Sequence, residues 1–177
     1  MAKRLLTLLN IVFLSAMLSM PAHANYFYIG LATGNAEASD NSLFVDSQQS
    51  GHYLNVGLVS DYGLGIEIGY FSMVEKAEPS ASPAIAKTSL TGQTTSLVAN
   101  IPFQDIMIFA SAGSFRWSIE EDDVEQFSGT SPTFSAGISW LFSNNWDLRL
   151  EYARYLDIGP NDTDISHARV GISYVFY

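Results

Sequence analysis

The stretch LRLEY, residues 148–152, alternates apolar side chains with charged ones. Residues 169–176, RVGISYVF, continue the same alternation, with arginine, glycine and serine between apolar and aromatic residues. Successive side chains of a β-strand point to opposite faces, so each stretch predicts a strand with one oily face and one face of charged or small residues. Which of these two faces lines the interior decides the fold.

The alternation recurs over the rest of the chain, and no stretch shows a sustained helical period. Bounded by turn residues, these segments predict eight strands. The strands are expected at residues 25–33, 51–60, 63–74, 88–100, 106–119, 130–142, 146–156 and 165–177.

The predicted connections alternate in length. Three are brief, at residues 61–62, 101–105 and 143–145, and four are longer and polar, at residues 34–50, 75–87, 120–129 and 157–164. Brief turns at one end and long loops at the other are typical of an outer-membrane barrel. The prediction is an all-β fold, an eight-stranded antiparallel up-and-down transmembrane β-barrel.

Composition excludes several function classes. The 177 residues contain no cysteine, and 18 acidic residues oppose 8 basic ones. The lack of cysteine excludes a disulfide scaffold and a thiol nucleophile, and the negative charge argues against a nucleic-acid partner. Although 47% of the residues are hydrophobic, no run after residue 24 reaches the roughly 20 apolar residues of a membrane helix. A chain of this kind crosses a bilayer only as closed strands.

Residues 1–24 have the features of a secretory signal peptide. Lys3 and Arg4 precede an apolar run at residues 5–20, and the small-x-small sequence AHA follows at residues 22–24. We expect residues 25–177 to form the outer-membrane β-barrel as one domain, exported through the periplasm to the cell outer membrane. This part keeps 6 basic residues against 18 acidic ones, a net charge of −12.

Charged residues of the strands share a face with glycine and serine, which suits the narrow interior of an eight-stranded barrel. Glu67, Arg149, Glu151 and Arg169 are therefore predicted to form an interior charge network. Glu151 and Arg169 are expected to be cross-strand partners, and Glu67 to reach an arginine across the lumen. The alternative is a soluble lipocalin-like barrel, in which the apolar face lies inside.

Aromatic residues gather near both ends of the predicted strands, which suggests two interfacial girdles. The band near the brief turns comprises Phe103, Trp140, Phe142, Trp146, Tyr174, Phe176 and Tyr177. The band near the long loops comprises Tyr53, Tyr70, Phe115, Trp117, Phe127 and Tyr155.

The C-terminal residues 169–176 resemble the signal that outer-membrane barrels present to the barrel-insertion machinery, with Gly171, Tyr174 and Phe176 at the matching positions and Tyr177 as one extra residue. Residues 65–70, 131–137 and 148–152 resemble, in order and spacing, the transmembrane domain of the OmpA family. In size the chain is similar to the OmpX and Ail type of small barrel. The resemblance implies an outer-membrane protein of a Gram-negative bacterium, whose partners are outer-membrane lipids and lipopolysaccharide.

Three functions remain open at this point. The favoured one is non-enzymatic: envelope integrity, or surface interaction through the external loops with a ligand that is unknown. The second is a narrow ion-conducting pore; in OmpA-like barrels this role attaches to interior charges, here Glu67 and Glu151.

The third is a lipid-modifying enzyme, which needs a Ser–His–acid set near the outer rim. Ser166 and His167 are adjacent and point to opposite faces of a strand, while His52 and His167 are expected to be rim residues. No catalytic residue, cofactor or metal site is predicted. The acidic residues 120–125 form either a solvated loop or a site for divalent cations.

Overall fold

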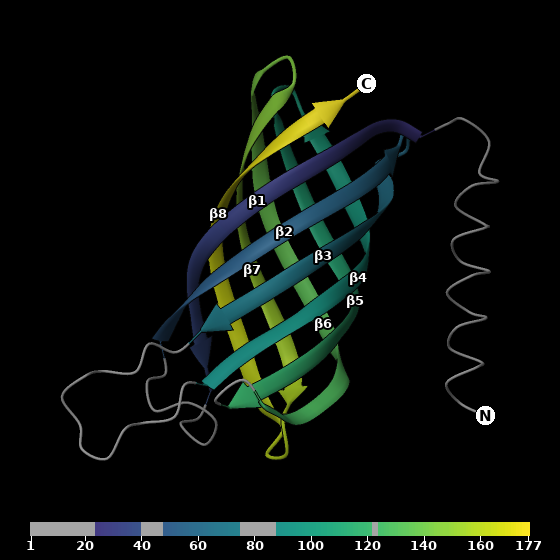
Figure 1. Cartoon of the computed structure of the whole chain (residues 1–177). Coiled ribbons are helices and arrows are strands. Elements are labelled where there is room, and N and C mark those ends of the chain that lie inside the picture. Colours follow the sequence, from purple (N-terminus) through teal and green to yellow (C-terminus); the bar gives the residue numbers. More distant parts are fainter. Residues whose placement is uncertain (1–23, 40–47, 75–87, 122–123) are drawn as a thin grey trace, which may run out of the picture.

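The computed structural model describes residues 24–39, 48–74, 88–121 and 124–177, and these residues form a closed antiparallel barrel (Figure 1). Each strand pairs with the next one along the chain, and β1 pairs with β8 to close the ring. The eight strands are β1 (Ala24–Ala38), β2 (Gln48–Ser60), β3 (Leu64–Val74), β4 (Thr88–Phe103), β5 (Ile106–Glu121), β6 (Val124–Ser143), β7 (Trp146–Ile158) and β8 (Thr163–Phe176).

The predicted strands are confirmed in number and order, but several extend further at the end that carries the long loops. The clearest difference is residues 120–129, which were expected to be a loop. Residues 120–121 and 124–129 instead extend β5 and β6, which stay paired as far as Glu121 and Val124. The predicted signal peptide lies outside the described residues except for its last position, Ala24, which begins β1.

The brief turns lie at the same end of the barrel as the C-terminus, at the top of Figure 1. The turn between β2 and β3 places Gly63 at φ +75°, and the Gly63 amide donates to the Ser60 carbonyl at 2.9 Å. Only glycine adopts this backbone region without strain. In outer-membrane barrels the short turns face the periplasm, so the opposite end of this barrel faces outward.

The apolar face of the strands forms the outer wall of the barrel. Leu148 and Ile172 are 38% and 43% exposed, whereas Glu67 is 2% exposed. A soluble barrel would bury the leucine and isoleucine and expose the glutamate, so the lipocalin-like alternative is wrong. Among the described residues, no helix is long and apolar enough to span a membrane.

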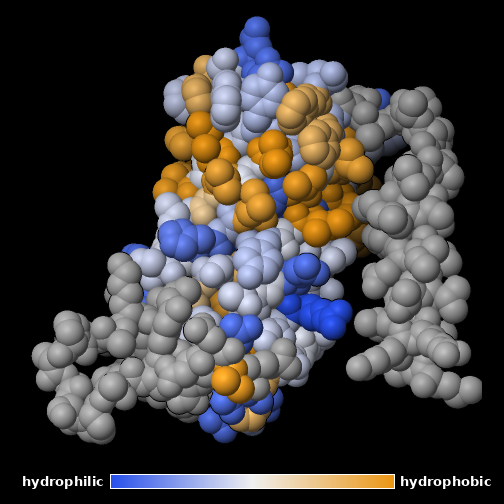
Figure 2. Space-filling model, in the orientation of Figure 1, coloured by the Kyte–Doolittle hydropathy of each residue, from blue (hydrophilic) through white to orange (hydrophobic). Residues whose placement is uncertain are grey.

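The outer wall changes character partway along the strands. Paired positions of β4, β5 and β6 form the apolar row Leu97, Ala112 and Phe134, and the next outward-facing row is Thr95, Ser114 and Pro132. On the face shown in Figure 2, this change appears as an orange band across the half of the barrel near the short turns and a mainly white and blue wall over the other half. The barrel therefore extends beyond its apolar band on the outer side.

The aromatic band at the periplasmic end is on the outer wall as predicted, with Trp140 and Phe176 both exposed. The second band is largely wrong. Tyr70 and Phe127 are exposed, but four other members are buried inside the barrel: Tyr53, Phe115, Trp117 and Tyr155. Beyond the apolar band the outer wall faces water, so at that level large rings are more stable in the lumen.

The position of the apolar band can be tested on β2, where Ser50 and Val56 face outward on the same strand. We expect Val56→Arg to lower the free energy of unfolding by about 2–4 kcal/mol, because it places a charge in the bilayer. Ser50→Arg should change it by less than about 1 kcal/mol. Urea titration of the barrel in lipid vesicles measures both values, and equal effects would contradict this placement.

Candidate functional site in the barrel lumen

Glu67 on β3 is the most heavily coordinated side chain of the lumen. Its carboxylate accepts hydrogen bonds from Tyr28 Oη at 2.5 Å, Tyr53 Oη at 3.0 Å and Asn55 Nδ2 at 2.8 Å. Arg149 Nη1, from the far side of the barrel, forms an ion pair with it at 2.8 Å. A buried carboxylate needs such partners, since an unpaired one costs several kcal/mol.

Glycines make room for the two tyrosines. Gly57 is the cross-strand partner of Tyr28, and a Cβ at Gly57 would collide with the Tyr28 ring. A Cβ at Gly69, which pairs with Asn55, would likewise collide with the Tyr53 ring. The glycines that the sequence places on the inner face thus hold the phenol groups against Glu67.

Glu151 on β7 is shared by two arginines. Arg169 lies directly opposite it on β8, with Nη2 2.6 Å from Oε1, and Arg149 Nε lies 3.2 Å from Oε2. The guanidinium groups also stack on rings, Arg149 at 3.9 Å from the Phe109 centroid and Arg169 at 3.6 Å from the Tyr53 centroid. Stacking supports the flat faces of the guanidinium groups, which cannot form hydrogen bonds.

The four ionic residues are all nearly inaccessible to water and carry equal numbers of positive and negative charges. On the periplasmic side of this network, a cavity of about 100 Å³ opens toward the short turns, lined among others by Tyr26, Asn100 and Arg149. The network thus forms a neutral, cross-linked layer between this cavity and the outer half of the lumen.

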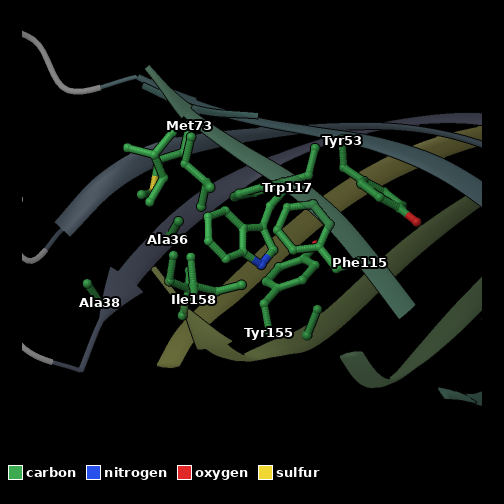
Figure 3. Close-up of a cluster of buried hydrophobic side chains, with 13 residues drawn as sticks. Ala36, Ala38, Tyr53, Met73, Phe115, Trp117, Tyr155 and Ile158 are labelled. Atoms are coloured by element: carbon green, nitrogen blue, oxygen red, sulfur yellow. The ribbon is translucent and has the colours of Figure 1, made fainter. Parts of the chain in front are cut away.

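The outer half of the lumen is filled by an apolar plug (Figure 3). Its centre is a group of rings, in which Tyr155 lies 5.0 Å from Phe71 and 4.6 Å from Phe115 between centroids. Trp117 packs in the same cluster and donates from Nε1 to Ser131 Oγ at 2.8 Å. The plug comprises Ala36, Ala38, Tyr53, Phe71, Met73, Leu90, Phe115, Trp117, Ile119, Ala153, Tyr155, Ile158 and Ile165.

The plug is the main feature that sequence reasoning missed. The signal for it was present, because Phe71 and Tyr155 share strand parity with Glu67 and Glu151. What the sequence did not show was the level at which the outer wall leaves the bilayer.

The residues considered for catalysis do not come together. Ser166 faces outward and accepts from Tyr152 Oη at 2.9 Å, whereas His167 is fully buried beside Phe71. His167 is therefore not on the exposed rim, as had been expected. His52 faces outward and pairs with Thr33 at 3.1 Å. Within the described ranges, no group of three or more acidic or histidine side chains is placed to hold a metal ion.

The residues of the C-terminal motif lie at the periplasmic end. Tyr174 packs edge-on against Trp146 at 4.9 Å between centroids and against Phe176 at 4.7 Å. Gly171 faces the lumen, where a Cβ would meet Ala32. Of the acidic run 120–125, residues 122–123 lie outside the described residues, and so do the side chains of residues 121 and 125.

Residues 10–176 match the family model described as "Outer membrane protein beta-barrel domain". The chain belongs to this family. It is an outer-membrane protein, consistent with the oily outer wall and the closed sheet. Among curated protein sequences, none matches the chain significantly.

Solved structures of small outer-membrane barrels share the fold. Neisserial surface protein A is 19% identical, with a TM-score of 0.66 over 85% of this chain and 97% of its own. Ail of Yersinia pestis, solved with the heparin analogue sucrose octasulfate, is 11% identical, with a TM-score of 0.61 over 85% and 98%. The outer membrane enzyme PagL is 12% identical, with a TM-score of 0.51 over 83% and 98%. At these identities the similarity establishes the fold alone.

The charge network can be tested with Glu67→Gln, which leaves two buried arginines facing a single carboxylate. We expect this variant to lose about 3–5 kcal/mol of unfolding free energy, the usual effect of removing one partner of a buried pair. Glu37→Gln, at an exposed position of β1, is the matched control and should be nearly neutral. Equal stability of the two variants in vesicles would show that the network does not hold the barrel together.

A double variant separates charge balance from lost packing. Glu67→Gln with Arg149→Gln leaves Glu151 and Arg169 as a neutral pair. We expect its destabilisation to be smaller than the sum of the two single effects by at least about 1 kcal/mol, because no unpaired charge remains. Strict additivity would contradict the coupling of Glu67 to Arg149.

Proposed function

We propose that this outer-membrane protein acts without enzymatic chemistry, by strengthening the envelope and by contacting ligands at its outer surface. The closed lumen is the observation that carries the proposal. A neutral ionic layer and an apolar plug fill it in series. With its interior used for its own packing, the surface that remains for function is the outer wall and the external loops.

The charge of the protein narrows the class of surface ligand. Of the 6 basic residues after residue 24, Arg149 and Arg169 are buried in the lumen. Four basic residues are left, with a large excess of acidic ones. The Ail structure contains a polysulfated ligand, but the balance in this chain favours neutral or cationic partners at the loops.

Deletion of the gene tests the envelope role. We expect the deletion strain to survive exposure to detergent and chelator less well than its parent, and the wild-type chain to restore survival. The proposal also predicts that overproduction leaves the mass spectrum of lipid A unchanged. Altered lipid A would support an enzyme, and unchanged survival together with unchanged surface binding would contradict the proposed role.

A gated pore is the second candidate, and one observation favours it. Glu151 contacts both Arg149 and Arg169, so a change of partner could open a path for small ions through the charged layer. The apolar plug opposes this reading, because ions do not cross a dry apolar segment at low cost.

Planar bilayer recording decides between the two functions. We expect the wild-type protein to show no conductance at all. The pore reading instead predicts wild-type conductance that disappears in Glu151→Ala or Arg169→Ala. Detergent blanks establish the baseline.

A further inference from the structure

The outer wall of β4, β5 and β6 carries an open groove of about 630 Å³ beyond the apolar band. Its walls are two outward-facing rows, set by the strand register: Gln93, Arg116 and Thr130, followed by Thr91, Ser118 and Ser128. The groove also touches Gly92, Trp117 and Gly129, which by strand parity turn inward and offer mainly backbone to the outside. The lining is therefore rich in hydroxyl and amide groups around one cation.

Arg116 is the cation of this groove, and it is exposed. It makes no ion pair with the described residues, unlike the other arginines. Arg154, the second arginine that faces outward, is held by Asp164 at 2.7 Å, and Arg149 and Arg169 are bound in the lumen network. Among the arginines of the described residues, Arg116 is thus the one whose guanidinium is open to a ligand.

The height of Arg116 matches the headgroup region of the outer leaflet. It follows Ala112, in the last apolar row, by four residues of β5. With a rise of about 3.4 Å per residue and a tilt of about 40°, it lies roughly 10 Å beyond the apolar band. The polar layer of a bilayer is about 5–8 Å deep on each side, and a long arginine side chain can reach back into it.

The chemistry of the groove suits a phosphorylated sugar. A guanidinium binds a phosphate through two parallel hydrogen bonds, and side chains such as Gln93 and Thr130 can bond to sugar hydroxyls. Carboxylates on this face lie further out, since Glu120 is four residues beyond Arg116 on β5. The nearest charge to the bilayer on this face is therefore positive.

We propose that this groove binds the phosphorylated sugar headgroup of lipopolysaccharide, with Arg116 on a phosphate. The width of the groove over three strands fits a disaccharide better than the single phosphate of a phospholipid. The proposal rests on the location of the barrel in the outer membrane and is independent of the envelope role.

Binding of bisphosphorylated lipid A to the purified barrel in detergent tests the proposal, by native mass spectrometry or by the shift in thermal unfolding. We expect Arg116→Gln to weaken binding about tenfold, as the loss of one charged phosphate contact does. Arg154→Gln, which removes an outward arginine already paired with a carboxylate, should bind like the wild type. Because both positions are exposed, neither substitution should change the unfolding temperature of the lipid-free barrel.

Three further probes identify the ligand. Dephosphorylated lipid A should bind the wild type as weakly as bisphosphorylated lipid A binds Arg116→Gln, and Arg116→Lys should recover only part of the affinity. Phosphatidylglycerol and inorganic phosphate should bind without dependence on Arg116. Equal binding of lipid A by Arg116→Gln and the wild type would overturn the proposal, and so would Arg116-dependent binding of phosphatidylglycerol at the same affinity.

Discussion

The pairing of β1 with β8 is the interaction on which the rest of the structure depends, since it removes the last free strand edge. In a bilayer an unpaired backbone amide or carbonyl has no water to bond with, so an open sheet of this sequence is not viable there. Closure with eight strands fixes a narrow lumen. Every inward side chain must then find its partners within that cylinder.

The surface that carries the apolar side chains changes along the barrel axis, from the outer wall in one half to the lumen in the other. In the half surrounded by lipid, apolar residues such as Leu148 lie outside and Glu67 and Arg149 lie inside. In the half beyond the apolar band, Arg116 and its polar neighbours lie outside while Phe71 and Tyr155 fill the lumen. Apart from Val124 and Phe127 at the outer end of β6, which are exposed, the large apolar residues of each level lie away from water, on the outer wall where there is lipid and in the lumen where there is none. A single closed sheet thus joins a membrane barrel to a soluble one.

The sequence predicts those parts of the fold that depend on the alternation of side chains along a strand, which has a period of two residues. Strand number, the face of each strand and the inward position of Glu67 and Glu151 all follow from alternation. The partners of Glu67 did not, because Tyr28 and Tyr53 reach it through register and through space left by glycines on other strands. The plug was missed for a different reason: parity assigns a face, but it does not say whether lipid or water lies beyond that face.

The neutrality of the lumen network has a consequence for the outer surface. Glu67 and Glu151 balance Arg149 and Arg169, so the whole net charge of residues 25–177 resides on the other side chains. These charges are not spread evenly along the axis. On the described outer wall Arg116 lies nearer the apolar band than Glu120, four residues further along β5, while Arg154 lies beside Phe134 and is paired with Asp164 at 2.7 Å. Because anionic headgroups attract a guanidinium and repel a carboxylate, the order of Arg116 and Glu120 along β5 favours the upright barrel in the membrane.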